Sequence, residues 1–269
     1  MKLPTLPHRI ICLTEEAAEL LYLLGEQDRI IGISAFALRP TGIKKNHPVV
    51  SVFTHTQIEK VGDLKPDLII GYSDIQKDIA RELIEKGHNV FISNHRSLQE
   101  VINYCATIAS LVDANSRFEK IVERWLEKIE EAKRFARKLK EQGHSLKVYI
   151  EEWDEPRISG IHYFSELVEL CGLEDINSHL RTGFLAKERF PDEKYIIESD
   201  PDLILACWCG KKVELDSFSQ REGWSSLKSV RNKQIYELPP EIFLQPGPAL
   251  FEEGIDYLIE LVEKMTRSS

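Results

Sequence analysis

The densest group of chemically reactive side chains is the segment Cys207-Trp208-Cys209-Gly210. Thiolates bind metals and carry out redox chemistry, but structural zinc sites usually separate paired cysteines by roughly two to four residues and add further ligands. Here one residue separates the two thiols, and the sequence contains no second cysteine pair and no H-E-x-x-H. The alternative interpretation is a strand end, with one cysteine in the core and the other facing a loop.

The acidic run 151–155 could supply carboxylates for general acid–base catalysis. Successive side chains of an extended chain point to opposite faces, so at most two of these carboxylates share a side. His162 and Tyr163 follow in a segment that we expect to be a loop, where a histidine more often makes a hydrogen bond than ligates a metal. A metal- or redox-dependent enzyme that uses Cys207, Cys209 and His162 is therefore one hypothesis. The glycine-rich loops that cradle nucleotides and the G-x-S-x-G nucleophile turn are absent from the sequence.

Aromatic residues gather outside the predicted helices, at the ends of predicted strands or in the loops after them. In open α/β sheets the carboxyl ends of the strands form the crevice in which ligands bind. Aromatic side chains at that edge suit a large, flat and partly apolar ligand held by stacking. The alternative is that some of them simply close the core below the loops. These residues are Phe36, Phe53, Tyr72, Trp153, Tyr163, Trp208, Trp224 and Phe243.

Two series of alternating strands and helices must position these residues. Strand-helix alternation at this spacing predicts mostly parallel sheets with helices on both faces, which is an α/β fold. The first series has strands at 8–13, 29–34, 65–72 and 88–93 and helices at 15–25, 57–64, 75–86 and 97–111; the second has strands at 146–153, 199–207 and 233–239 and helices at 164–171 and 248–265. The segments 35–57 and 154–163 are expected to be loops, and the Pro-rich segment 240–249 is expected to run over the surface.

A long amphipathic helix is expected between the two series. Apolar residues recur there at three- and four-residue steps from Asn115 to Gln142 without Gly or Pro, and such a helix would be roughly 40 Å long. The sequence Pro-Asp-Leu-Ile occurs once on each side of it, at 66–69 and 201–204. We therefore predict an N-terminal α/β lobe at 1–112, an interlobe backbone helix at 113–144 and a C-terminal α/β lobe at 145–269.

Composition narrows the class of protein. The 269 residues are 42% hydrophobic and 29% charged, as in ordinary soluble proteins, and no apolar run has the length of a transmembrane helix. The formal net charge of -9 argues against nucleic acid or an anionic membrane surface as a partner. Five cysteines in apolar surroundings and no visible signal peptide predict a cytoplasmic location. The alternative is an extracytoplasmic location, if a leader has been removed.

Nearly the whole chain resembles the class III substrate-binding proteins of ABC importers, whose two α/β lobes are joined by one rigid helix. The opening segment 9–34 and the sequence Val61-Gly-Asp-Leu-Lys-Pro-Asp-Leu-Ile-Ile carry this resemblance. Three further segments, 152–162, Cys209-Gly210 and 245–248, are similar to the branch that binds corrinoids such as vitamin B12. The resemblance implies a non-enzymatic protein that holds a corrinoid between its lobes and changes shape little on binding.

The resemblance also implies which residues contact the ligand. Phe53 and Phe36 take the places of aromatic residues that pack on the corrin ring, and His162 is a candidate axial ligand of the cobalt. Gln245 and Ala249 stand where the family often has arginine, which weakens any contact with an anion there. The predicted ligand-binding set is Phe36, Phe53, Tyr72, Trp153, His162, Tyr163, Trp208, Cys209, Gly210, Phe243 and Gln245.

Two lysines bear on the partner. Lys77 and Lys194 occupy the places where importer-docking relatives present a glutamate to basic residues of the membrane permease. The reversed charge would replace attraction by repulsion, so docking on an ABC permease is doubtful and a cytoplasmic relative is predicted. The alternative is an importer protein for a ferric siderophore or haem. Against a siderophore, few arginines are available for an anionic chelate, with Arg39, Arg157 and Arg181 as the candidates.

Overall fold

The computed structural model describes residues 6–267, which group into two compact units. Unit 1 comprises the chain up to Arg124 together with Gln245–Pro248, and unit 2 comprises Trp125–Leu244 together with the chain from Ala249 onward. Each unit contains one sheet flanked by helices, so the predicted α/β class is confirmed. The predicted division at 1–112, 113–144 and 145–269 stays a prediction. Within residues 6–267, no helix is both long and apolar enough to span a membrane.

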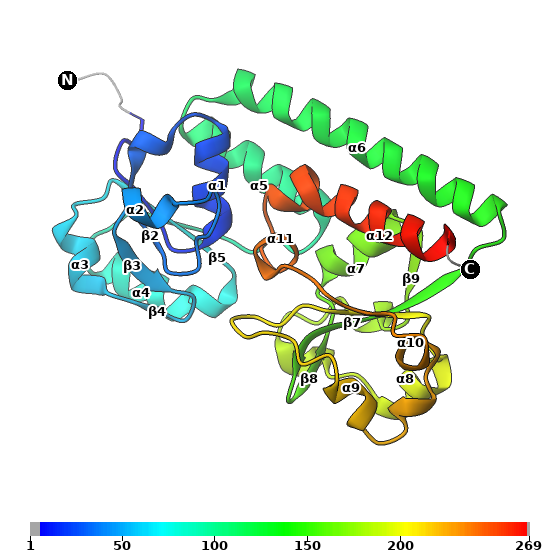
Figure 1. The fold of residues 1–269 in the computed structure, drawn as a ribbon. Coiled ribbons are helices and arrows are strands. Elements are labelled where there is room, and N and C mark those ends of the chain that lie inside the picture. Colours follow the sequence, from blue (N-terminus) through cyan, green and yellow to red (C-terminus); the bar gives the residue numbers. More distant parts are fainter. Residues whose placement is uncertain (1–5, 268–269) are drawn as a thin grey trace. The chain divides into compact units, whose positions relative to one another are not determined.

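Unit 1 is built on a six-stranded sheet in the order β4-β3-β2-β1-β5-β6, in which only β4 runs antiparallel to its neighbour (Figure 1). The strands are β1 Ile10–Cys12, β2 Ile30–Ser34, β3 Val49–Val52, β4 His55–Thr56, β5 Leu68–Tyr72 and β6 Val90–Ser93. The α-helices are α1 Glu15–Leu23, α2 Ile43–Asn46, α3 Ile58–Asp63, α4 Lys77–Glu85 and α5 Leu98–Leu111.

Strand alternation assigns the two faces of this sheet to different helices. Ile11 and Ile69 lie opposite each other on β1 and β5 and pack in one cluster with Val61 of α3 and Leu83 of α4. Side chains one residue further along a strand point to the other face, where α1 and α5 pack. The predicted capping box of α5 is present, with the Ser97 side chain accepting a hydrogen bond from the Glu100 amide.

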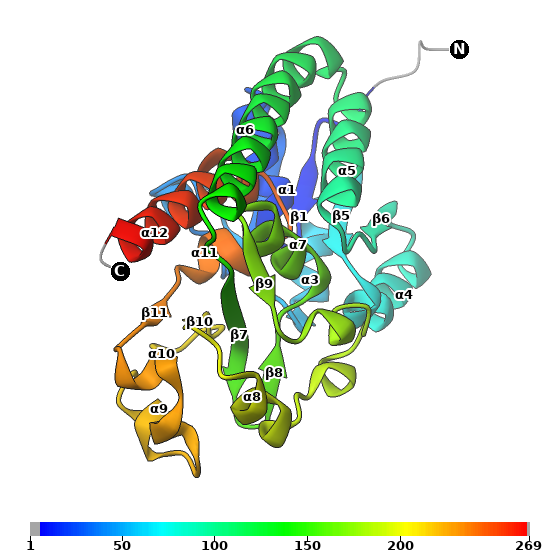
Figure 2. The same ribbon diagram turned by 90° about the vertical axis from the view of Figure 1, so that its right-hand side faces the viewer.

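Unit 2 contains a five-stranded sheet in which β7 is the central strand (Figure 2). Strands β10 and β11 lie on one side of β7, and the antiparallel strand β8 and the parallel strand β9 pair with its other side. The strands are β7 Leu146–Asp154, β8 Arg157–Ser159, β9 Leu173–Asp175, β10 Leu203–Ala206 and β11 Ile235–Glu237; the α-helices are α7 His162–Leu170, α8 Glu193–Ser199, α9 Ser217–Gln220, α10 Lys228–Arg231, α11 Pro240–Phe243 and α12 Ile255–Arg267, preceded by a π-helical turn at Leu250–Gly254.

The long helix α6 spans Asn115–Glu141, as the periodicity predicts. Its first turns belong to unit 1 and the part from Trp125 onward belongs to unit 2. In unit 2 the indole of Trp125 stacks on Phe251 at 4.9 Å and its Nε1 donates a hydrogen bond of 2.6 Å to Glu252. The part of α6 that belongs to unit 2 therefore packs against the C-terminal segment of that unit.

Among the segments that differ from the sequence prediction, three carry predicted ligand-binding residues. Residues 35–57 contain α2, β3 and β4, because Val49–Val52 forms a short strand directly after Pro48. Residues 154–163 contain β8 and the start of α7, so His162 opens a helix rather than lying in a loop. Residues 240–249 contain α11 and are mostly buried rather than running over the surface, because Phe243 and Leu250 anchor them in the core.

Candidate ligand-binding site

Two predicted aromatic residues meet at the carboxyl edge of the sheet in unit 1. Ser34 of β2 is in register with Ser51 of β3, and Phe36 and Phe53 each follow two residues later. Phe36 is 39% exposed and Phe53 is half-buried. Gln76 holds the loop after β3, because its Nε2 donates a hydrogen bond of 2.9 Å to the Phe53 carbonyl. This edge therefore presents two accessible rings in the turns that follow neighbouring strands.

Tyr72 ends β5 at the same edge but is only 5% exposed. Its hydroxyl donates a hydrogen bond of 3.1 Å to the His95 carbonyl. The guanidinium of Arg96 lies 5.4 Å from the ring centroid and forms an ion pair of 2.8 Å with Asp74. The ring of Tyr72 is therefore part of the packed base of the edge, and its contact with a ligand stays a prediction.

The segment Gln245–Pro248 returns to unit 1 and lies on a buried histidine. His95 Nε2 donates a hydrogen bond of 2.8 Å to the Pro246 carbonyl, and its ring stacks on Tyr104 at 4.3 Å. Burial lowers the pKa of His95 to about 4, against the opposing effect of the Pro246 carbonyl. Gln245 itself is 8% exposed, and its Oε1 accepts no hydrogen bond within residues 6–267.

Glu16 lies under the same segment. A Cβ on Gly247 would lie 2.5 Å from the Cβ of Glu16, so the backbone approaches this side chain as closely as only glycine permits. Burial, followed by the charge of Glu15, raises the pKa of Glu16 to about 8. The hydroxyl of Thr14 donates a hydrogen bond of 2.5 Å to its carboxyl group. Sequence patterns did not indicate Glu16 or His95, because their partners come from distant parts of the chain.

The first two carboxylates of the acidic run, Glu151 and Glu152, belong to two separate buried ion pairs. Glu151 is fully buried, and both of its oxygens accept hydrogen bonds from Arg221, at 2.6 and 2.8 Å. The indole of Trp208 and the hydroxyl of Tyr149 donate to the same carboxylate at 3.2 and 3.1 Å. Four donors on one carboxylate fix the orientation of Trp208, which is 2% exposed.

Glu152 points to the other face of β7 and has its own partners. Its Oε2 accepts a hydrogen bond of 2.7 Å from Arg189, and its Oε1 accepts one of 2.7 Å from the Ile161 amide, next to the start of α7. Both neighbouring carboxylates are thus held by protein donors. These contacts fix both carboxylates in place on the two faces of β7.

A lysine that the sequence did not single out joins the two predicted tryptophans of unit 2. Lys211 Nζ lies 4.5 Å from the ring centroid of Trp153 and 4.7 Å from that of Trp208, and it forms an ion pair of 2.6 Å with Asp154. The Trp153 indole donates a hydrogen bond of 2.9 Å to the Glu155 carbonyl. No local motif indicates this contact, because Lys211 and Trp153 are brought together only by the pairing of β7 with β10.

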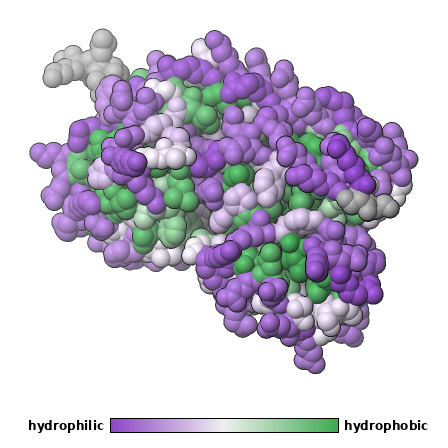
Figure 3. Space-filling model, viewed as in Figure 1, coloured by the Kyte–Doolittle hydropathy of each residue, from purple (hydrophilic) through white to green (hydrophobic). Residues whose placement is uncertain are grey.

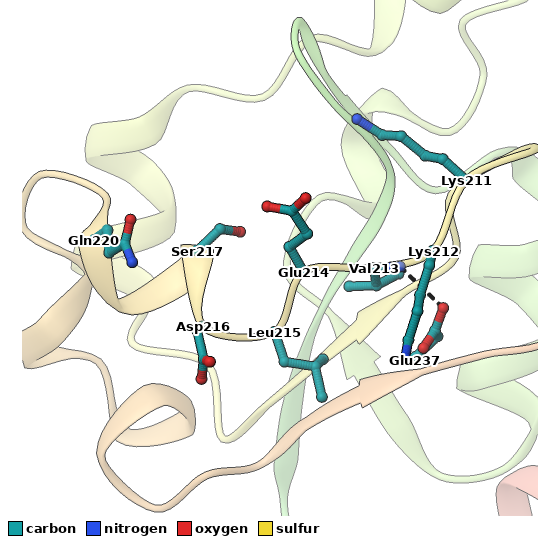
Figure 4. Close-up of a pocket in the computed structure, with 9 residues that line it drawn as sticks. All are labelled: Lys211, Lys212, Val213, Glu214, Leu215, Asp216, Ser217, Gln220 and Glu237. Atoms are coloured by element: carbon teal, nitrogen blue, oxygen red, sulfur yellow. Dashed lines mark hydrogen bonds between the residues drawn. The ribbon is translucent and has the colours of Figure 1, made fainter.

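The loop that carries Lys211 also lines an open groove of about 900 Å³ in unit 2 (Figure 4). The Val213 amide donates a hydrogen bond of 2.9 Å to Glu237, which fixes the middle of the loop to β11. In Figure 4, Lys211 extends toward the green hairpin of β7 and β8, whereas Lys212 points toward Glu237. The groove lining carries charges of both signs and offers no aromatic face.

The surroundings of the cysteines and of His162 bear on the hypothesis of a metal- or redox-dependent enzyme. Within the described part of the chain, no three His, Cys, Asp or Glu residues are grouped to hold a metal ion. Cys207 is buried, which raises the pKa of its thiol, whereas Cys209 is exposed. His162 is half-buried, and its Nε2 lies 3.2 Å from Glu166 Oε1 on the same helix. Its role as an axial cobalt ligand stays a prediction.

The other predicted contact residues of unit 2 differ in exposure. Gly210 is exposed and has a φ of +77°. Tyr163 is 3% exposed and Phe243 is fully buried, with its ring stacked on Phe164 at 5.5 Å. Phe243 and Tyr163 therefore form core contacts in this conformation, and their contact with a ligand stays a prediction.

Both lysines predicted to affect docking are on the surface. Lys77 begins α4, and Lys194 lies in the first turn of α8, where it forms an ion pair of 3.6 Å with Glu198. Polar side chains cover most of the surface visible in Figure 3, with apolar patches between them. The effect of the two lysines on docking stays a prediction.

The chain is similar in sequence to known binding proteins. A family model described as "Periplasmic binding protein" matches residues 10–242. The ABC transporter substrate-binding lipoprotein YvrC of Bacillus subtilis is 24% identical over 263 residues, which cover 95% of this chain and 80% of that protein. A vitamin B12-binding protein of Yersinia pseudotuberculosis is 25% identical over 248 residues, which cover 86% of each chain.

Solved structures share the fold. The periplasmic heme-binding protein RhuT from Roseiflexus gives a TM-score of 0.80 at 18% identity, covering 95% of this chain and 98% of that one. The periplasmic vitamin B12 binding protein BtuF of Vibrio cholerae gives 0.72 at 19% identity, covering 97% and 98%. Proteins with different ligands thus have this fold, so the fold alone does not select a ligand.

These relatives correct the predicted location. The similar Bacillus subtilis protein is named a lipoprotein of an ABC transporter, and relatives of this type imply an extracytoplasmic location, so the cytoplasmic prediction is wrong. The cysteine argument failed for a physical reason. Four of the five cysteines are buried, and burial protects a thiol from pairing whatever the redox state of the compartment.

Proposed function

The chain belongs to the family of periplasmic binding proteins, and on that premise we propose that its ligand is a corrinoid. The protein is a substrate-binding protein of the ABC-importer type and is not an enzyme. The observation that carries the proposal is the pair of accessible rings, Phe36 and Phe53, at the carboxyl ends of β2 and β3. A similarity to vitamin B12-binding proteins over 86% of the chain supports the same class of ligand.

The physical argument rests on the shape of the ligand. A corrin ring is large, nearly flat and apolar on much of its face, so aromatic side chains recognise it by stacking and by burial of apolar surface. Phe36 and Phe53 directly follow the neighbouring parallel strands β2 and β3 and lie at one edge of the sheet. Removing one ring forfeits about 1–2 kcal/mol of stacking and apolar burial, which is about 5- to 30-fold in affinity.

The experiment that tests this function is a titration of the purified protein with cyanocobalamin, cobinamide, haem and a ferric siderophore. Visible absorption and calorimetry would follow the binding. We expect saturable binding of a corrinoid, weakened about 5- to 30-fold by Phe36→Ala and by Phe53→Ala. Phe135→Ala is the matched control, because Phe135 is a half-buried phenylalanine on α6 and not at the carboxyl edge of a sheet.

Each other result has a defined meaning. Saturable binding of haem or a siderophore without corrinoid binding would reassign the ligand. Corrinoid binding that both phenylalanine variants leave unchanged would show that the ligand does not use the edge of unit 1.

A further inference from the structure

Lys211 is held against two indole rings by contacts on three sides. Its ammonium group lies 4.5 Å from the centroid of Trp153, 4.7 Å from that of Trp208 and 2.6 Å from Asp154 Oδ1. A cation over the face of an indole is attracted by the quadrupole of the ring. The lysine side chain is nevertheless 41% exposed. It therefore lies at the surface as a cover over the aromatic pair and not as a buried structural charge.

The two tryptophans differ in what they still offer to a ligand. Trp208 is 2% exposed and its indole nitrogen is bound to Glu151, so it belongs to the core. Trp153 is half-buried, and its own nitrogen is bound to the Glu155 carbonyl. The indole of Trp153 is thus the accessible ring of this pair, and Lys211 lies over it.

The rest of the loop has anchors of its own. Val213 is bound to Glu237 through its amide, and Lys212 extends toward that glutamate (Figure 4). The Lys211 side chain can therefore leave the indole while the middle of the loop stays bound to β11. The hydrogen bond from Lys211 contributes to the lowered pKa of Asp154, although partial burial of that carboxyl acts in the opposite direction.

We propose that Lys211 is a specificity-determining residue that covers the accessible indole of Trp153 and that a flat ligand must displace it in order to stack there. This inference rests on the proposed function, because it assumes that Trp153 of unit 2 takes part in binding the ligand. The displaced ammonium enters water, which solvates it well. A ligand with a large flat face compensates for the contacts that Lys211 loses, because it stacks on Trp153. A small ligand does not compensate for them, so the lysine selects against small ligands.

The test compares Lys211→Ala with the neighbouring control Lys212→Ala. Two cation–π contacts and one partly exposed ion pair are each worth a few-fold in an equilibrium constant. Lys211→Ala should therefore bind the corrinoid about three- to thirty-fold more tightly, mainly through faster association, while Lys212→Ala should bind like the unchanged protein. Unchanged or weaker binding by Lys211→Ala would overturn the proposal, since it would mean that the lysine is a bystander or a ligand contact.

A second measurement needs no ligand and separates failure of the cover from failure of the proposed function. Acrylamide quenching of tryptophan fluorescence should increase in Lys211→Ala and in Asp154→Asn, but not in Lys212→Ala. In a Trp153→Phe background the increase should disappear, which assigns it to Trp153. Equal quenching of all variants would reject the cover even if a corrinoid binds. Increased quenching in Lys211→Ala and Asp154→Asn, together with no binding of a corrinoid, would support the cover of Trp153 by Lys211 and would reject the corrinoid assignment.

Discussion

Replacing Glu151 by glutamine should strongly destabilise unit 2. The carboxylate is fully buried and accepts two hydrogen bonds from Arg221 and one each from Trp208 and Tyr149. The guanidinium of Arg221 also lies 4.0 Å from the ring centroid of Phe218. Glu151→Gln keeps the shape of the side chain but leaves this buried cation without its counter-charge.

The size of the effect follows from the burial of both partners. Removing one member of a buried ion pair costs about 3–5 kcal/mol, and the glutamine oxygen still accepts one hydrogen bond, so we expect about 3 kcal/mol. With a urea dependence of about 2 kcal/mol per M, the unfolding midpoint falls by about 1.5 M. Glu151→Gln combined with Arg221→Met removes both charges, so its loss should be smaller than the sum of the two single losses by at least about 1 kcal/mol.

The assay is urea unfolding followed by intrinsic tryptophan fluorescence. All four tryptophans lie in unit 2, so this signal reports that unit selectively. Glu174→Gln is the control, because Glu174 is exposed on β9 and should change stability by less than about 0.5 kcal/mol. A Glu151→Gln midpoint equal to that of the control, or strictly additive losses in the double variant, would refute the reasoning.

Further predictions concern unit 1 and the thiols. The pKa of Glu16 is raised to about 8 in the folded protein, so the stability of the protein should fall as pH rises toward 8. Glu16→Gln should flatten this fall in stability between pH 6.5 and 8, as measured by calorimetric unfolding scans. Gly247→Ala should lower the stability of unit 1 by about 1–3 kcal/mol, because its Cβ would collide with Glu16, and the same scans would measure it. A thiol reagent should label one cysteine rapidly in the native protein, and Cys209→Ser should abolish that labelling.

A specific result would contradict each of these predictions. His95 contributes in the opposite direction, because burial lowers its pKa to about 4 and stability therefore rises with pH as this histidine loses its proton. This rise is complete near pH 6.5, the ordinary pKa of histidine, so it lies below the pH range measured for Glu16. A decline between pH 6.5 and 8 that persists in Glu16→Gln would assign it to another group. Gly62→Ala is the control for Gly247→Ala, because Gly62 does not have a positive φ and its added Cβ would meet only His88 Nε2 at 3.8 Å, which is an ordinary contact. Rapid labelling of several thiols would show that the buried cysteines open readily.

Regular patterns made much of the fold predictable. The three- and four-residue spacing of apolar side chains specified α6 to within one residue of its end, and Ser97 with Glu100 specified the cap of α5. These are local signals, because a helix is stabilised by contacts between residues close in sequence. The short strands β3 and β8 escaped prediction for different reasons. β3 gains its parallel hydrogen bonds from β2, which is separated from it by a long segment, whereas β8 is a three-residue strand that folds back on the end of β7 and is too short to show a strand pattern of its own.

The chemistry of the site divides in the same way. The sequence by itself determined which aromatic residues follow the strands, and it placed Phe36 and Phe53 among them. Only the tertiary structure decided which rings remain accessible, because exposure depends on side chains that arrive from distant segments. Arg221 pairs with Glu151 in the core, the Trp208 indole donates a hydrogen bond to the same carboxylate, and Lys211 covers Trp153. Charge pairing and burial act through space, so no spacing along the chain could have revealed them.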